Sequence, residues 1–164
     1  GGMGDGGGCH PRDNIALSHL SQKLKLSYDW FDSIMMQREK QSEWLANLII
    51  ENSKNRQINT LGKTFKPETN LILGSPSLLL KNILLEKQKK VFSWDPYIDK
   101  KYEDVCEKYN WTNNKISHVF FIGTKHPDFI KFKYPKNSII IDPFRYIYNV
   151  KGSKIIRIGD NTNK

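Results

Sequence analysis

Cys9 stands in a run of glycines near the start of the sequence, GGMGDGGGCHPRD. It directly precedes a segment with helical spacing, and Arg12 follows three residues later. Helix N-terminal amides and a nearby cation both favour the thiolate, the nucleophilic form of cysteine. Glycines also let a ligand approach the backbone closely. We therefore expect Cys9 to be a nucleophile, with Asp13 ordering a water or a proton beside it; a loop cysteine without a role is the alternative.

The same glycine run contains the spacing G-x-G-x-x-G, formed by Gly2, Gly4 and Gly7. A dinucleotide fingerprint needs a strand directly before it, a helix directly after it and an acidic residue about 20 positions further on. Here no strand signal precedes the glycines, and Asp29 falls in a turn beyond the first helical segment. We interpret the match as accidental.

The sequence contains two cysteines, Cys9 and Cys106. Two are too few for a disulfide framework, which favours a reducing, cytoplasmic setting. Cys9 and His10 are adjacent and have no visible partner pair, so we predict no metal site. Cys106 falls on the apolar side of a predicted helix and is expected to be buried.

The elements that must position these residues fall into two parts. Residues 12–26 and 28–55 have helical spacing, and the second segment has a discontinuous apolar face with Trp30, Ile34, Trp44, Leu48 and Ile49. Such a face needs a partner, either a second subunit or another part of the chain. We predict that residues 1–56 form the cysteine loop and central helices, and that residues 57–164 form a separate domain.

From residue 57 onward, strand and helix signals alternate. Strands are predicted at 57–62, 90–96, 117–123, 137–142 and 153–159, with helices at 75–88 and 100–110. The run SHVFFIG is apolar without alternation, as in a parallel strand buried on both faces. This order predicts an α/β fold with a parallel sheet and flanking helices.

Phe65 and Lys66 lie in LGKTFKPET, between the first strand and the next helix. Ligands of open α/β sheets bind at the carboxyl ends of strands, and the helix beginning near Ser75 could offer amides to a phosphate. A surface lysine before a turn proline is the alternative reading. Asp95 ends the next strand and could contact a ribose or cap a turn. His118 and His126 are expected to have structural or solvent roles.

The formal net charge of +9 favours anionic partners, although a solvated lysine-rich surface explains it as well. The lysines are scattered, and the usual nucleic-acid motifs are missing from the sequence, so we expect no nucleic-acid partner. No apolar run is long enough to span a bilayer, and we expect no membrane partner.

Three collinear segments resemble the UDP-glucose/GDP-mannose dehydrogenase family. GMGDGGGCHPRD resembles its catalytic-cysteine loop, and LGKTFKPETNLILGSPSLLL the opening of its UDP-binding domain. VFSWDPYID, FFIGTKHPDF and IIIDPFRYI resemble the strands that follow. The resemblance implies a Rossmann-like parallel sheet preceded by a long helical connecting segment that dimerises.

The resemblance also implies the chemistry, namely NAD-dependent oxidation of a nucleotide-sugar C6 alcohol to a carboxylate through a thiohemiacetal and a thioester on a cysteine. Cys9 and Asp13 would be catalytic and Arg12 would lie near the NAD cofactor. The nucleotide-sugar, such as a UDP-sugar, would be held by residues of two segments: Gly2, Gly4, Gly6, Phe65 and Lys66. Arg145 would reach a substrate bound to the neighbouring subunit.

The chain departs from the family pattern at Leu73 and Gly74, where the family has an Arg that contacts NAD and a Glu. The NAD-holding domain of the family and a catalytic Lys and Glu have no counterpart in this sequence. We therefore expect the chain to be part of a longer enzyme and to be inactive alone. A non-catalytic nucleotide-sugar-binding module and a dimerisation module are the alternatives. The sequence does not choose among UDP-glucose, GDP-mannose and related substrates.

Overall fold

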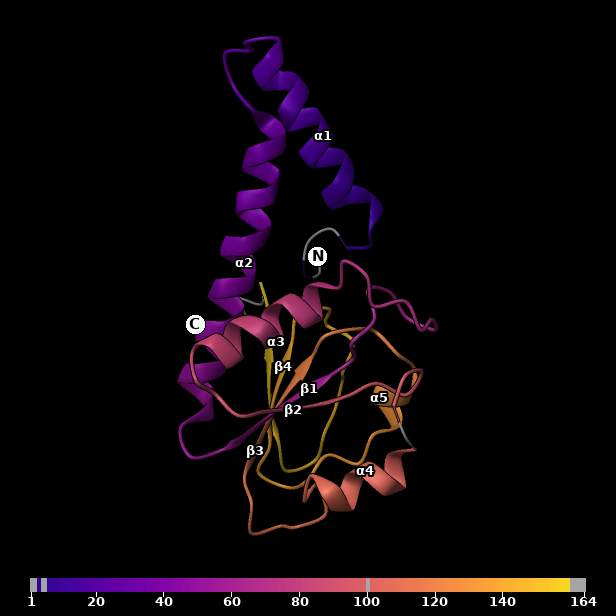
Figure 1. The fold of residues 1–164 in the computed structure, drawn as a ribbon. Helices are drawn as coiled ribbons and strands as arrows, with labels where there is room; N and C mark the ends of the chain where they lie inside the picture. Colours follow the sequence, from indigo (N-terminus) through magenta and orange to yellow (C-terminus); the bar gives the residue numbers. More distant parts are fainter. Residues whose placement is uncertain (1–2, 4–5, 100, 160–164) are drawn as a thin grey trace.

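A helical hairpin opens the structure, a computed structural model that describes residues 3, 6–99 and 101–159. Helix α1 (Cys9–Lys23) is followed by α2 (Trp30–Ser53). The Asp29 carboxylate caps α2 by accepting the amides of Phe31 and Asp32, and it also accepts the Ser18 hydroxyl of α1 at 2.6 Å. The outer part of the hairpin, where α1 leads into α2, projects away from the rest of the molecule (Figure 1).

The second part is a parallel sheet with helices on its faces, as predicted. Its strands are β1 (Gln57–Leu61), β2 (Val91–Trp94), β3 (His118–Ile122), β4 (Ile139–Asp142) and β5 (Lys154–Arg157). The helices are α3 (Pro76–Glu86), α4 (Tyr102–Lys108) and α5 (Asp128–Lys131). The described strands pair in the order β2-β1-β3-β4-β5, and every pair is parallel. This confirms the Rossmann-like α/β class.

The apolar strand β3 explains why the sheet is covered on both sides. All five of its residues are buried, and successive side chains point to opposite faces. Val119 and Phe121 pack with the side chains of α2 and α3, whereas Phe120 and Ile122 pack into an aromatic cluster with Trp94 and Trp111. Residues of α4 and α5 complete that second cluster, so the sheet separates two cores.

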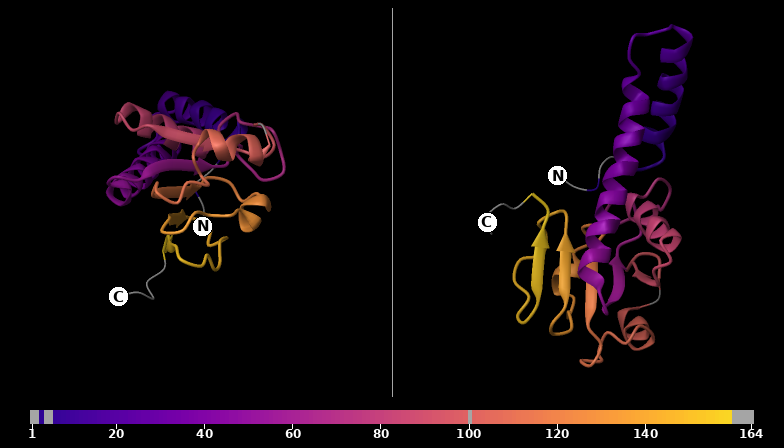
Figure 2. Two further views of the ribbon diagram at one scale, coloured as in Figure 1. Left: turned by 90° about the horizontal axis from the view of Figure 1, so that it is seen from below. Right: turned by 90° about the vertical axis from the view of Figure 1, so that its left-hand side faces the viewer.

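Helix α2 belongs to both parts of the chain. Its C-terminal half supplies Leu45, Ala46 and Ile49 to the core on one face of the sheet. Its N-terminal half runs beyond the carboxyl ends of the strands with α1 (Figure 2). The boundary predicted after residue 56 lies directly before β1. Helix α2, which precedes that boundary, nevertheless packs into the sheet layer.

Two details of the helices differ from the sequence-based expectation. Helix α1 begins at Cys9 itself, with Gly8 as its N-cap residue, so Cys9 lies inside the first turn. The first turn of α1 therefore contains no acidic residue, and Asp13 lies just after it. The short helix α5 was not expected, because four residues are too few for a periodic pattern. Among the described residues, no helix is both long and apolar enough to cross a membrane.

Candidate functional site

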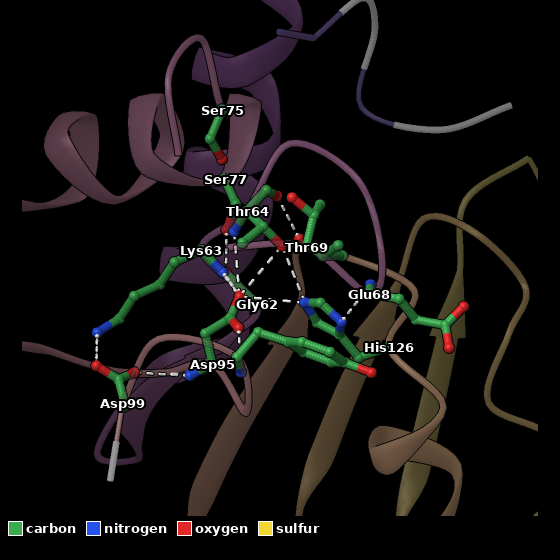
Figure 3. Close-up of polar contacts among 12 residues, drawn as sticks. Gly62, Lys63, Thr64, Glu68, Thr69, Ser75, Ser77, Asp95, Asp99 and His126 are labelled. Atoms are coloured by element: carbon green, nitrogen blue, oxygen red, sulfur yellow. Dashed lines mark hydrogen bonds and ion pairs between the residues drawn. The ribbon is translucent and has the colours of Figure 1, made fainter. Parts of the chain in front are cut away.

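The strand order changes direction between β1 and β3. From β1 the chain continues to β2 on one side, and from β3 it continues to β4 and β5 on the other. In open parallel sheets, ligands bind in the crevice outside the carboxyl ends of the strands at such a switch point. The loop that leaves β1 at Gly62 (Figure 3) meets the one that leaves β3 at Gly123, whose amide donates to the Leu61 carbonyl at 2.7 Å.

Glycines at these two strand ends allow α3 to pack onto the sheet edge. Gly62 has φ +98°, and the Ser77 hydroxyl donates to its carbonyl at 2.6 Å. A Cβ on Gly123 would overlap the Ser77 hydroxyl. Ser75 caps α3, and Pro76 is its first residue, as predicted. The N-terminal turn of this helix therefore lies at the switch point. Pro76 has no amide hydrogen, and the amides of Leu78 and Leu79 donate to Ser75, so the Ser77 amide is the one in this turn that could meet an anionic group.

A buried carboxylate holds the loop after β1. Asp95 follows β2 and is fully buried. Its Oδ2 accepts the Lys63 amide at 2.6 Å and the Thr64 amide at 3.1 Å, and its Oδ1 accepts the Tyr97 amide at 2.9 Å. His126 Nε2 lies 3.2 Å from the same Oδ2 (Figure 3). Asp95 thus caps the turn rather than facing a ribose.

The charge on Asp95 is stabilised despite its burial. Burial alone would raise the pKa of this carboxyl, but the hydrogen bond from His126 and those from the Lys63 and Tyr97 amides outweigh it. The net effect lowers the pKa of Asp95 to about 2. Asp95 is therefore ionised throughout the physiological pH range.

The glycine turn before Cys9 is seated on this edge of the molecule. The Gly7 amide donates to the Gly74 carbonyl at 3.2 Å. A Cβ on Gly6 would lie 3.2 Å from Pro76 Cδ, and one on Gly7 would lie 3.1 Å from the Phe65 ring. A side chain at either position would require Pro76 or Phe65 to shift, and Gly7 also has φ +90°, which side chains rarely adopt. The glycines thus allow close packing within the chain, in addition to the close approach of a ligand to the backbone that the sequence predicts.

Cys9 is exposed in the first turn of α1, where backbone amides are free. Arg12 and Asp13, both more than half exposed, form an ion pair, with Arg12 Nε and Nη2 each 2.9 Å from Asp13 Oδ1. This contact raises the pKa of Arg12, through the hydrogen bond to Asp13 and the negative charge of that carboxylate. The structure therefore brings Cys9, Arg12 and Asp13 together on one helix end.

Of the remaining predicted ligand residues, Phe65 and Lys66 lie in the loop after β1, and Lys66 Nζ is 5.4 Å from the Phe65 ring centroid. Arg145 follows β4 with φ +55°, and its guanidinium donates to the carbonyls of Ile158 and Gly159. It is tied to its own chain. Gly2 and Gly4 lie outside the described residues.

Two hollows deserve comparison with this site. One of about 490 Å³ lies between α1 and α2 and is lined partly by His10 and Arg38, whose Nη2 donates to the Gly74 carbonyl at 3.4 Å. It therefore adjoins the Cys9 turn. A larger one of about 760 Å³ lies beside α4 and includes Cys106 and Trp111. Neither pocket is lined by Phe65 or Lys66.

Sequence reasoning missed the contacts among Thr64, Asp95 and His126. These residues are separated by 31 and 62 positions along the chain, so no local spacing joins them. Each follows a different strand, and the three strands are neighbours in the sheet. Polar residues directly after successive apolar strands were the available signal.

The lowered pKa of Asp95 makes a prediction about acid stability. Because the folded pKa lies below the unfolded value of 3.8, the stabilisation is complete above about pH 4 and is lost as the pH falls to about 2. It amounts to about 2 kcal/mol. Asp95→Asn should lower the free energy of unfolding at pH 7 and flatten its fall between pH 4 and 2, measured by urea denaturation. The exposed Asp128→Asn control should keep the wild-type slope; parallel curves for wild type and Asp95→Asn would contradict the assignment.

No protein-family model matches the chain. Curated proteins with similar sequences are found. UDP-glucose 6-dehydrogenase TuaD of Bacillus subtilis is 29% identical over 98 residues, which is 58% of this chain and 21% of the relative. UDP-glucose 6-dehydrogenase of Rickettsia typhi is 31% identical over 99 residues, or 58% of this chain and 23% of the relative. GDP-mannose 6-dehydrogenase of Pseudomonas aeruginosa is 26% identical over 72% of this chain and 27% of the relative. The chain thus spans about a fifth to a quarter of these relatives.

Solved structures are similar over nearly the whole chain. A UDP-glucose dehydrogenase from Pyrobaculum islandicum has a TM-score of 0.73 and 23% identity, covering 94% of this chain and 37% of that one. A UDP-D-ManNAc dehydrogenase from Pyrococcus horikoshii has a TM-score of 0.74 and 24% identity, covering 96% and 39%. The chain is therefore similar in sequence to UDP-glucose and GDP-mannose 6-dehydrogenases, and it shares its fold with part of known nucleotide-sugar dehydrogenases.

Proposed function

We propose that this chain supplies the catalytic-cysteine and nucleotide-sugar-binding part of an NAD-dependent nucleotide-sugar 6-dehydrogenase. One observation carries the proposal: the hydrogen bond from the Gly7 amide to the Gly74 carbonyl seats the Cys9 turn beside α3 and the Phe65 loop. A nucleophile and an anion-suited helix end thereby share one edge of the molecule. The sequence similarity to 6-dehydrogenases gives that arrangement its reaction class.

Phe65 and Lys66 are proposed to hold the nucleotide. The Phe65 ring offers an apolar face to a base or sugar, and the Lys66 ammonium is exposed and suits a phosphate. Gly2, Gly4 and Gly6 are proposed to line the sugar, since backbone without side chains admits close approach. Arg145 is proposed to reach a substrate on a neighbouring subunit, which requires it to leave the carbonyls of Ile158 and Gly159.

Cys9 is proposed to hold the sugar between two oxidations. Its thiolate adds to the C6 aldehyde carbon, forming a C–S bond while the carbonyl oxygen gains a proton. Transfer of a hydride from that carbon to NAD, with loss of the hydroxyl proton, leaves a thioester. Water then cleaves the C–S bond to give the carboxylate, a proton and the free thiol. Covalent capture prevents escape of the aldehyde. Asp13 is proposed to order the attacking water.

The hydride acceptor of such a reaction is NAD, two molecules for each sugar. The described residues do not form a dinucleotide site on their own, because Gly6 and Gly7 pack against Pro76 and Phe65 and leave no open glycine cradle. Leu73 stands exposed where the related family has an arginine. We propose that NAD is held mainly by sequence beyond these 164 residues, with Arg12 beside it, and that the chain alone does not turn over substrate.

The hairpin is proposed to form a homodimer. Among the described residues, ten of the eighteen exposed large apolar side chains lie between Ile15 and Trp44. Helix α1 buries only Ser18 and Ser21, so its apolar side chains face outward. A surface of this kind on an amphipathic hairpin marks an interaction site. A second copy is the partner we favour, since the outer part of the hairpin projects clear of the sheet (Figure 1) and its apolar side chains would be buried against those of another hairpin.

Calorimetry with UDP tests the nucleotide site. Lys66→Met should raise the Kd for UDP by about tenfold, because it removes a cation from the phosphate. Lys90→Met removes the same charge beside the opposite end of the sheet, where Lys90 lies over Phe92, and should leave the Kd unchanged. Equal affinities for the two variants, or no binding by folded wild-type protein, would contradict the assignment.

Thiol labelling tests Cys9. Iodoacetamide should modify Cys9 in the folded protein several times faster than in the urea-unfolded chain, because a catalytic nucleophile must be more reactive than an ordinary exposed cysteine. Arg12→Gln should slow the reaction. The buried Cys106 serves as the internal control and should react only after unfolding. A folded-state rate at Cys9 no faster than the unfolded rate would remove its nucleophilic role.

Light scattering tests the dimer. Replacing two outward-facing residues of the hairpin, Leu24→Glu and Trp30→Glu, should convert the dimer to a monomer, since buried charges oppose association. Ile130→Glu on α5 places a charge at an equally exposed apolar position away from the hairpin and should not change the mass. A wild-type monomer at all concentrations would contradict a hairpin dimer.

A further inference from the structure

The two ring nitrogens of His126 make different hydrogen bonds. Nδ1 lies 3.2 Å from the Glu68 amide, which can only donate, so Nδ1 must accept. The ring proton of a neutral imidazole is then on Nε2. Nε2 lies 2.9 Å from Thr64 Oγ1 and 3.2 Å from Asp95 Oδ2, both of which can accept that proton. These partners assign the Nε2–H tautomer.

The orientation of the ring is fixed by packing. His126 is fully buried. Tyr97 stacks on one face with the ring centroids 4.8 Å apart, and Phe129 meets the ring edge-on at 5.4 Å. Both nitrogens are thereby aimed at the loop after β1 (Figure 3). A buried ring nitrogen without a hydrogen bond would destabilise the fold by more than one hydrogen bond stabilises it, so burial favours the conformation in which both nitrogens are bonded.

The two contacts lie on either side of the ligand residues. Thr64 precedes Phe65 and Lys66, and Glu68 follows them with φ +56°. The Thr64 carbonyl also accepts the Thr124 hydroxyl at 2.6 Å, whereas the side chains of Lys66 and Glu68 are exposed. His126 therefore joins the start and the end of a five-residue turn whose middle faces solvent.

We infer that His126 is a positioning residue for nucleotide-sugar binding, one that clamps the 64–68 turn with both ring nitrogens and so fixes Phe65 and Lys66. This inference rests on the proposed role of those two residues in holding the nucleotide. The two nitrogens have separable duties: Nε2 anchors the turn to the buried Asp95, and Nδ1 sets the part that carries Lys66 and Glu68.

Two substitutions separate these duties. In His126→Gln the side-chain amide can reach the position of Nε2 and donate to Asp95, but nothing accepts the Glu68 amide. In His126→Asn the shorter side-chain oxygen can take the place of Nδ1, but the contact with Asp95 is lost. His118→Gln is the matched control, since it replaces another fully buried histidine at the opposite end of β3.

The expected results differ between the variants. His126→Gln should raise the Kd for UDP roughly five- to tenfold, the scale of one lost hydrogen bond, and should speed hydrogen exchange of the Glu68 amide. His126→Asn should restore slow exchange and UDP affinity while lowering the urea midpoint further. His118→Gln should lower the midpoint without changing the Kd. Equal UDP affinity in wild type and His126→Gln, or affinity losses that only follow the loss of stability across all three variants, would overturn the inference.

Failure of the clamp and failure of the nucleotide site can be distinguished. Long-range proton–nitrogen spectra of the wild-type protein report the tautomer without any ligand. A proton on Nε2 together with slow exchange at Glu68 supports the clamp, even if UDP does not bind and the proposed function fails. A proton on Nδ1, or an unprotected Glu68 amide, overturns the clamp whatever the UDP affinity.

Discussion

The first turn of α3 packs directly onto the carboxyl ends of β1 and β3, and the other features of the site depend on that contact. Gly123 has no room for a side chain because the Ser77 hydroxyl occupies that space and donates to the Gly62 carbonyl. The loop after β1 must therefore leave along the sheet edge, where the Asp95 carboxylate receives its amides. The Cys9 turn then seats against the same helix through Gly74.

The hairpin buries much less apolar surface than the sheet domain. The sheet domain buries its apolar residues on two faces, and the C-terminal half of α2 is part of that core. Beyond the sheet, α1 and the start of α2 touch each other mainly through small and polar groups such as Ser18 and Asp29. Two helices with so little mutual apolar burial are marginal in water. Association through their outer faces would supply the missing burial, which links the position of Cys9 to assembly.

Much of the fold follows from local pattern. The unbroken apolar run of β3 predicts a strand covered on both faces, and Ser75-Pro76 predicts the start of α3. The position of Phe65 and Lys66 after a strand was also predictable, because the carboxyl ends of parallel strands share one edge. The alternation of strands and helices did not give the strand order, which depends on long-range pairing of β1 with β3.

The parts that the sequence could not supply are contacts between distant residues. In the sequence His126 has no neighbouring partner, but in the fold it follows β3 and lies within hydrogen-bond distance of Thr64 and Asp95. Arg145 was expected only as a substrate ligand, and its contacts with the Ile158 and Gly159 carbonyls after β5 join residues 13 and 14 positions apart. The start of α1 at Cys9 depends on Gly7 being held by Gly74, which no helix propensity encodes.

Chemical-shift mapping with UDP tests the central claim most directly, because it locates the ligand on the chain. The account predicts that the largest amide shifts fall at the switch point, in residues 62–68, 75–77 and 123–126. Shifts confined to the residues around the hollow beside α4, such as Cys106 and Trp111, with the switch-point amides unmoved, would contradict it.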